Sequence, residues 1–285
     1  MKIAIYGSRR QDPYVKELSD FFLTLADAGA EIVMHRKLYT SLLRLMPLAL
    51  KAVTRVADGP DFEADVAVSL GGDGTFLRTA MWVGSKDIPI IGINTGHLGY
   101  LSAATIGELP EVASELIAGN LTTETRSLIE VVSPVLKTWP YALNEVAVMK
   151  DESSSMITAD TTINSTPLAV YRADGLIICT PTGSTAYNLS VGGPVMQPGA
   201  PVWAISPVAA HSLGMRPLVV SDDSDVAVRV TARAAGFRLS LDGRSTILPV
   251  GTEVMLRRAP FGLRIITRPG HEFPAPLRAK LGWGG

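Results

Sequence analysis

The sequence has little of what marks a secreted, membrane-bound or nucleic-acid-binding protein. Its 285 residues include one cysteine, Cys179, which cannot form an internal disulfide and favours a reducing compartment. The formal net charge is -1, so no basic excess is available to hold a nucleic-acid backbone. The longest apolar stretches, 42–53 and 201–220, are interrupted by charged residues, proline or histidine, so neither predicts a membrane span. We therefore expect a cytoplasmic protein with no nucleic-acid or membrane partner.

Two common nucleotide-binding motifs are also missing. The chain contains no GxxxxGK[ST] sequence, which disfavours a Walker-type NTPase. No GxGxxG follows the first apolar run, which disfavours a hydride-transferring Rossmann dehydrogenase. If the chain binds a nucleotide, other residues must do so.

The first hundred residues alternate strand and helix signals. Apolar runs at 3–6, 31–35, 64–70 and 88–93 predict strands, and 12–28, 37–53 and 75–83 predict helices, the second interrupted by Pro47. Strands separated by glycine turns and helices are typical of a parallel sheet with crossover helices. We therefore predict an α/β domain with a Rossmann-like parallel sheet over residues 1–104.

The pattern changes after about residue 105. A helix is predicted over 109–117, and short β-branched runs then follow, separated by turn pairs such as Asp242-Gly243. The runs include 128–135, 145–149, 156–163, 168–171, 175–179, 227–230, 239–241 and 253–266. This predicts a mostly antiparallel, all-β C-terminal domain over 105–267. We expect the tail, 268–285, to pack back on the first domain.

A glycine turn with one carboxylate stands between a predicted strand and a predicted helix. Residues Gly71 to Thr75 read GGDGT, and the missing side chains would let backbone N–H groups approach a phosphate. Asp73 would repel that phosphate, so its presence needs a reason. It could bind magnesium, or it could act as a general base in phosphoryl transfer. The alternative is that Asp73 only caps the helix.

Two further segments are candidates for ligand binding. Residues 94–101 read NTGHLGYL and follow a strand, at the sheet edge where ligands of α/β proteins bind, so we expect them near the GGDGT turn. Residues 174–190 read DGLIICTPTGSTAYNLS, and their clustered hydroxyl groups could bind phosphate or sugar oxygens. The alternative for this second segment is a Ser/Thr-rich turn with a buried Tyr187.

Taken in order, these segments resemble the NAD kinase family. The matching pieces are GGDGT at 71–75, NTGHLGYL at 94–101, the pair Asn144-Glu145, residues 174–194, residues 206–220 and LDG at 241–243. GGDG is shared with diacylglycerol, sphingosine and phosphofructo-kinases, whereas TPTGSTAY is more particular to NAD kinases.

The resemblance implies an ATP-dependent kinase that adds phosphate to the 2′-hydroxyl of the adenosine ribose of NAD. It also implies a divalent metal ion such as Mg²⁺, with no residue assigned to it, and assembly into a homodimer or homotetramer. Asp73 would be the catalytic base, and we expect NAD in a cleft between the domains. The implied phosphate- and ATP-binding positions are Gly71, Gly72, Gly74 and Thr75. The implied NAD-binding positions are Asp73, Gly74, Arg78, Asn144, Glu145, Arg172, Asp174, Thr185, Ala186, Tyr187, Asn188, Leu189, Ser190 and Ala209.

Two positions depart from the family pattern, and two other functions stay open. Arg244 stands where a glutamine often follows the DG turn, and Ser155 stands where some members have histidine. These departures bear on the choice between NAD and NADH.

The alternative functions are a GGDG-type kinase with a lipid or sugar acceptor, and a non-catalytic sensor that binds NAD(P).

Overall fold

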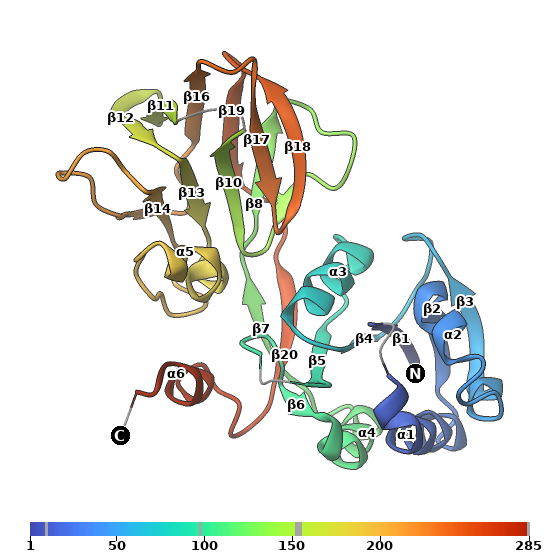
Figure 1. Ribbon diagram of the computed structural model, residues 1–285. Helices are drawn as coiled ribbons and strands as arrows, with labels where there is room; N and C mark the ends of the chain where they lie inside the picture. Colours follow the sequence, from blue (N-terminus) through green and yellow to red (C-terminus); the bar gives the residue numbers. More distant parts are fainter. Residues whose placement is uncertain (9–10, 97–98, 152–155, 284–285) are drawn as a thin grey trace. The chain divides into compact units, whose positions relative to one another are not determined.

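The computed structural model describes residues 1–8, 11–96, 99–151 and 156–283 (Figure 1). The chain divides into two compact units. Unit 1 comprises Met1–Thr125 and Leu263–Gly285, and unit 2 comprises Arg126–Gly262. The boundaries therefore lie at 125/126 and 262/263, where the sequence analysis expected 104/105 and 267/268.

Unit 1 is built on a largely parallel sheet. In the described part of the chain this sheet has eight strands in the order β3-β2-β1-β4-β5-β20-β7, and β6 also pairs with β5. The pairings of β1 with β2 and β4, and of β5 with β4 and β20, are all parallel, which confirms the predicted Rossmann-like sheet. The strands are β1 (Lys2–Gly7), β2 (Glu31–His35), β3 (Val53–Ala57), β4 (Val66–Leu70), β5 (Ile90–Asn94), β6 (Ala104–Thr105), β7 (Thr122–Arg126) and β20 (Leu263–Thr267).

The position of β20 explains where the boundaries fall. The sequence analysis treated 253–266 as one β run, and this is wrong, because the run is two strands, β19 (Glu253–Arg258) and β20. Pro260 lies between them and has no N–H to donate to a ladder. β19 pairs antiparallel within unit 2, while β20 pairs with β5 in register Ile265 to Ile90. Because β7 adjoins β20 in the sheet, the segment before residue 126 belongs to unit 1.

The helices of unit 1 follow the apolar spacing of the sequence, with one exception. Helix α1 (Val15–Asp27) buries Leu18, Phe22 and Leu25, and Gly29, with φ of +79°, ends it. The single helix expected over 37–53 is wrong: α2 (Arg36–Leu42) stops before Pro47, and a short 3₁₀ helix, η2 (Ala49–Ala52), precedes β3. The others are η1 (Asp12–Tyr14), α3 (Asp73–Val83), η3 (Ile106–Glu108), α4 (Leu109–Ala118) and α6 (Pro274–Leu281).

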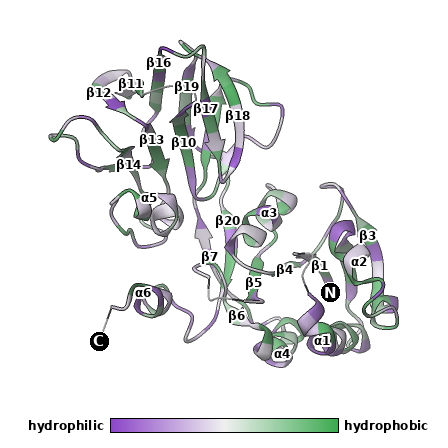
Figure 2. Cartoon of the chain, in the orientation of Figure 1, coloured by the Kyte–Doolittle hydropathy of each residue, from purple (hydrophilic) through white to green (hydrophobic). Residues whose placement is uncertain are grey.

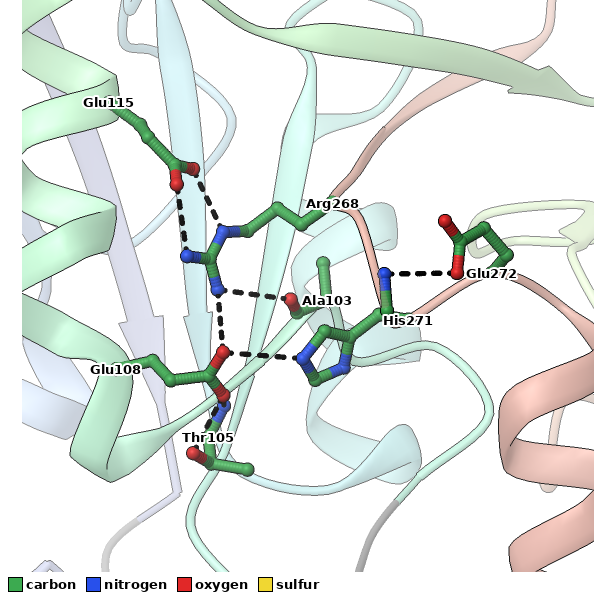
Figure 3. Close-up of polar contacts among 8 residues, drawn as sticks. Ala103, Thr105, Glu108, Glu115, Arg268, His271 and Glu272 are labelled. Atoms are coloured by element: carbon green, nitrogen blue, oxygen red, sulfur yellow. Dashed lines mark hydrogen bonds and ion pairs between the residues drawn. The ribbon is translucent and has the colours of Figure 1, made fainter.

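A polar cluster connects the segment after β20 to the start of α4 (Figure 3). The guanidinium of Arg268 donates two hydrogen bonds to the carboxylate of Glu115, at 2.8 and 2.9 Å, and one to Glu108 at 3.0 Å. The His271 ring also contacts Glu108, at 3.3 Å. Burial opposes ionisation of Glu108, but hydrogen bonds from Thr105, His271 and Arg268 outweigh it and lower the Glu108 pKa to about 2. The tail is therefore tied to unit 1 by charged groups.

Unit 2 confirms the predicted mostly antiparallel β structure. Its described residues form two six-stranded sheets, in the orders β15-β14-β13-β10-β17-β18 and β12-β11-β16-β19-β8-β9. Trp203 and Phe237 are fully buried in its core. The strands are β8 (Ile129–Ser133), β9 (Tyr141–Ala142), β10 (Glu145–Lys150), β11 (Ile157–Ile163), β12 (Thr166–Ala173), β13 (Gly175–Cys179), β14 (Val202–Val208), β15 (Leu218–Ser221), β16 (Val226–Ala232), β17 (Gly236–Leu241), β18 (Arg244–Pro249) and β19; the helices are η4 (Thr182–Thr185) and α5 (Tyr187–Ser190).

Three strands, β4 and β5 in unit 1 and β13 in unit 2, are buried along their whole length and are mostly hydrophobic. Figure 2 shows the hydrophobic colour along β5 and β13, and every residue of β4, β5 and β13 is buried. Continuous apolar runs of this kind are typical of strands covered on both faces. No helix in the described ranges is both long enough and apolar enough to cross a membrane.

Candidate active site

The GGDGT turn joins β4 to α3, and its geometry depends on glycine. Gly71 has φ of +151°, and a Cβ there would lie 2.5 Å from the Thr75 hydroxyl oxygen, so a side chain at this position would be strained. Gly72 is the N-cap residue of α3 and Asp73 is its first helical residue. The alternative that Asp73 serves only as the cap of this helix is therefore wrong, because the cap position belongs to Gly72.

The Asp73 carboxylate is held by backbone N–H groups of the 94–101 segment. Oδ2 accepts the N–H of Tyr100 at 2.9 Å, and Oδ1 accepts the N–H of Leu101 at 3.1 Å. This confirms the prediction that the two segments lie together at the carboxyl ends of β4 and β5. Burial and the negative charge of Asp73 raise the pKa of the Tyr100 phenol. His97 and Leu98, within the same segment, lie outside the described residues.

The turn presents backbone donors beside this carboxylate. The N–H of Gly71 donates to Ile93, and those of Thr75 and Phe76 donate to the Gly72 carbonyl. The first N–H groups of a helix have no partner within the helix, so in the described structure Asp73 and Gly74 offer donors to a ligand. Gly72 and Gly74 are exposed. The geometry therefore fits an anion, with Gly71 shaping the turn.

Arg78 lies one turn further along α3. Its guanidinium is exposed and donates to the hydroxyl of Thr75 at 3.2 Å. Thr75 itself is buried, so its hydroxyl orients Arg78. The Arg78 guanidinium thus lies one helical turn from the predicted phosphate-binding residues and contacts one of them, Thr75.

In unit 2, Glu145 begins β10 and carries a buried oxygen with no partner. Within the described structure, no donor lies within hydrogen-bonding distance of Oε2. Burial and the negative charge of Asp242 raise the Glu145 pKa to about 7, against a hydrogen bond from the backbone N–H of Tyr187. Buried polar atoms nearly always have a partner, so this oxygen is a position where a ligand could donate. Asn144, its neighbour, is also buried.

The hydroxyl-rich loop after β13 is mostly bonded to itself. The Thr180 hydroxyl donates to the Leu143 carbonyl at 2.5 Å, and the Ser184 hydroxyl donates to the Pro181 carbonyl at 2.7 Å. Thr182 accepts a hydrogen bond from Arg126 at 3.2 Å. These three side chains are buried and build the loop, whereas Thr185, the hydroxyl residue among the predicted NAD-binding positions of this loop, is half-buried.

The short helix α5 contains exposed and buried positions. Asn188 is fully buried: its amide nitrogen donates to the Pro194 carbonyl at 3.0 Å, and its oxygen accepts the Ser206 hydroxyl at 2.6 Å. A Cβ at Gly193 would overlap this amide. Tyr187 is 38% exposed, so the alternative of a buried tyrosine is wrong. Ala186 and Leu189 are half-buried and Ser190 is exposed.

The remaining predicted NAD-binding residues of unit 2 lie near the ends of β12, β13 and β14. The Asp174 carboxylate forms an ion pair with Lys150 at 2.9 Å. Arg172 is exposed, and Ala209, also exposed, has φ of +48°. Lys150 escaped the sequence analysis, because its proximity to Asp174 depends on the register of β10 against β13.

The first of the two departures from the family pattern has a structural role. The Arg244 guanidinium donates to the carbonyls of Trp139 at 2.7 Å and Tyr141 at 2.6 Å. Arg244 thereby connects β18 to the segment before β10. Ser155 lies outside the described residues.

These observations define a class of protein: a two-unit kinase with a GGDG turn on a parallel sheet and a second, β-rich unit. The chain matches the ATP-NAD kinase N-terminal domain over residues 10–121 and the ATP-NAD kinase C-terminal domain over residues 143–267. It belongs to the NAD kinase family.

Individual NAD kinases are similar in sequence to this chain over almost its whole length. It is 43% identical to an NAD kinase of Bacteroides fragilis, covering 100% of this chain and 98% of the relative. It is 42% identical to an NAD kinase of Porphyromonas gingivalis, covering 99% and 98%. The lipid- or sugar-kinase alternative is thereby disfavoured.

Solved structures share the fold. A yeast NADH kinase complexed with NADH has a TM-score of 0.87 at 22% identity, covering 100% of this chain and 88% of that one. An NAD kinase from Archaeoglobus fulgidus in complex with ATP has a TM-score of 0.74 at 24% identity, covering 99% and 98%.

Proposed function

We propose that this chain is an ATP-dependent NAD kinase in which Asp73 is the general base. The observation that carries the proposal is the Asp73 carboxylate, which two backbone N–H groups hold at the start of α3, beside exposed glycines. A carboxylate accepts about four hydrogen bonds, so two lone pairs stay available after these two bonds. Asp73 can therefore accept a proton from a hydroxyl placed next to a phosphate.

The reaction proceeds by one displacement. The 2′-hydroxyl of the adenosine ribose of NAD loses its proton to Asp73 while its oxygen forms a bond to the γ-phosphorus of ATP. The bond between that phosphorus and the β,γ-bridging oxygen breaks, and ADP leaves. The N–H groups of Asp73 and Gly74, with Arg78, stabilise charge on the transferred phosphoryl group.

Residues of unit 2 hold NAD in this proposal. The buried Oε2 of Glu145 accepts a hydrogen bond from a ribose hydroxyl or an amino group, and Asn144 recognises the same part of the molecule. The exposed ring of Tyr187 packs against a flat base. Contacts with NAD stay predictions for the remaining positions of unit 2: Arg172, Asp174, Thr185, Ala186, Leu189, Ser190 and Ala209. In this proposal the buried Asn188 acts by fixing the loop.

The residues present fit a magnesium ion that arrives with ATP. In the described part of the chain, no three His, Cys, Asp or Glu side chains gather as metal ligands. Mg²⁺ commonly keeps several waters and binds substrate phosphates with one or two carboxylates, so Asp73 would hold it through water and keep an oxygen free for the proton. When bound, it would neutralise negative charge on the phosphates.

The cytoplasmic location and the homodimer or homotetramer stay predictions.

The direct test is to measure NADP formation by the purified chain with ATP, Mg²⁺ and either NAD or NADH. General base catalysis is typically worth about 10²–10⁴-fold, so Asp73→Asn should reduce kcat by that factor. Asp27→Asn, an exposed position at the end of α1, is the matched control and should leave kcat unchanged. Near-normal turnover by Asp73→Asn would disprove the role of Asp73. Binding of NAD by calorimetry with no NADP formed would favour the sensor.

A further inference from the structure

The turn between β17 and β18 carries a buried carboxylate with three backbone partners. Asp242 has φ of +48° and Gly243 has φ of +78°, and together they reverse the chain at the end of the hairpin. Asp242 Oδ2 accepts the N–H of Leu143 at 2.8 Å, and Oδ1 accepts those of Asn144 at 2.8 Å and Glu145 at 3.2 Å. The N–H of Asp242 donates back to the Glu145 carbonyl at 3.2 Å.

We propose that Asp242 is a positioning residue that fixes Asn144 and Glu145 for NAD, an inference that rests on the proposed function of this site. Leu143 and Asn144 lie between β9 and β10, so no strand ladder holds them. Their carbonyls accept hydrogen bonds from the hydroxyl and the N–H of Thr180 at 2.5 and 2.9 Å. Asp242 takes the N–H groups of the same residues, so the short segment is fixed from both sides.

A neutral side chain could not replace the carboxylate. Three buried N–H groups point at Asp242, and both of its oxygens accept. An asparagine of the same size has only one acceptor oxygen, and its NH₂ group would face an N–H donor. A buried donor without an acceptor is costly, so the segment would move or open.

The carboxylate is retained against an electrostatic penalty. Burial raises the Asp242 pKa, whereas the three N–H groups and the positive charge of Arg244 oppose that rise. Burial and the Asp242 charge together raise the pKa of Glu145, which also faces the buried Cys179 of β13 and the Tyr187 N–H. Asp242 therefore affects both the position and the protonation of the carboxylate that carries the unpartnered oxygen.

These contacts predict an effect on NAD binding more than on chemistry. Asp242→Asn should raise the KM for NAD about ten- to a hundredfold, because the segment that carries Asn144 and Glu145 loses a charged acceptor for its N–H groups. The kcat and the KM for ATP should change less than threefold. The pH midpoint of the KM for NAD should also move to lower pH, because Glu145 loses a negative neighbour. A purely structural role would not move that midpoint.

The matched control is Asp222→Asn. Asp222 is also a buried carboxylate of unit 2, but it pairs with Arg258 at 3.3 Å, and in the described structure it has no hydrogen bond to residues 143–145. The Asp222→Asn variant should have a lower free energy of unfolding, measured with urea, while its KM for NAD stays at the wild-type value. An Asp242→Asn variant that folds and keeps both the wild-type KM for NAD and its pH midpoint overturns the inference. If the wild type forms no NADP, the proposed function itself fails.

Hydrogen exchange on the unmodified chain decides the case if Asp242→Asn does not fold. Saturating NAD should slow exchange of the amides of residues 143–145 at least tenfold, because the ligand would stabilise the segment that Asp242 holds. Unchanged exchange at those three amides, with NAD bound, would overturn the inference.

Discussion

Gly99 lies directly against the carboxylate of Asp73. A Cβ at position 99 would overlap Oδ1 and would lie 2.9 Å from the carboxyl carbon. The absence of a side chain at Gly99 thus allows Tyr100 and Leu101 to reach the carboxylate with their N–H groups. The orientation of the proposed base depends on a glycine 26 positions further along the chain.

Gly99→Ala should therefore reduce kcat. The added methyl must push Asp73 from its position, and a displacement of about 1 Å from productive geometry can cost roughly 100-fold. Steady-state kinetics with NAD and ATP would measure the loss. Gly96→Ala is the control from the same segment, since a Cβ there meets nothing within 4 Å. Equal kcat values for the two variants would contradict the role given to Gly99.

Gly183→Ala should weaken NAD binding and stability together. A Cβ at Gly183 would overlap the carbonyl oxygen of Asn144, so the loop and the Asn144-Glu145 segment must separate. Overpacking of this kind costs about 1–3 kcal/mol of unfolding free energy. Urea unfolding and the KM for NAD would measure both effects. Gly214→Ala, whose nearest neighbour lies 3.8 Å away, should change neither.

Glu145→Gln should change the pH dependence of stability. The Glu145 pKa is about 7 in the folded chain against 4.5 ordinarily, so the folded state binds an extra proton between these values. The wild type therefore loses up to about 3 kcal/mol of stability from this group as pH rises from 4.5 through 7. The variant lacks this titrating group. Its free energy of unfolding, relative to that of the wild type, should therefore be higher at pH 8 than at pH 5.

Urea unfolding at both pH values would test this prediction. Glu253→Gln is the control, because its side chain is 43% exposed and forms a surface pair with Arg229. The difference in unfolding free energy between this control and the wild type should be the same at the two pH values, within about 0.5 kcal/mol. A Glu145→Gln difference that does not vary with pH would contradict the raised pKa.

Arg268→Met should loosen the attachment of the C-terminal tail. The Arg268 side chain is only 10% exposed, and its removal leaves Glu108 and Glu115 without their cation (Figure 3). We expect the free energy of unfolding to fall by about 1–3 kcal/mol at pH 7. The Glu108 pKa is lowered to about 2, so its favourable contribution is present above 4.5 and is lost as pH falls toward 2.

The difference between wild type and Arg268→Met should therefore narrow in acid. Thermal or urea unfolding at pH 7 and near pH 2, where Glu108 becomes protonated in the folded chain, would measure it. Arg264→Met removes a more exposed arginine that pairs with Asp87 at 3.7 Å, and it should cost less than about 1 kcal/mol. A difference in unfolding free energy that is as large near pH 2 as at pH 7 would show that the carboxylates do not depend on Arg268.

The sequence predicted the parts of the fold that depend on local pattern. Continuous apolar runs ending in glycine identified β4, β5 and their parallel arrangement, and the meeting of Asp73 with residues 99–101 followed from that arrangement. The return of β20 to the first sheet was not predictable, because a run of β-branched residues does not say which sheet it joins.

The same limit applies to the candidate site. The clustered hydroxyls of 174–190 predicted contact with a ligand, with a Ser/Thr-rich turn as the alternative, but the sequence could not show that Thr180 and Ser184 bond inward. Asp242 stood in an ordinary Asp-Gly turn, and its partners are almost a hundred residues earlier in the chain. Only the pairing of β10 with β17 brings them together.

The path of β20 has a consequence for synthesis on the ribosome. β7 pairs in the sheet of unit 1 through β20, and β20 is made only after all of unit 2. The nascent chain up to residue 262 therefore contains all of unit 2 but an incomplete first sheet, with the side of β5 that β20 will occupy still uncovered. An open strand edge of that kind is prone to pairing with other chains. A ribosome stalled before Leu263 should expose this edge to chaperones, whereas synthesis and folding of β20 should cover it.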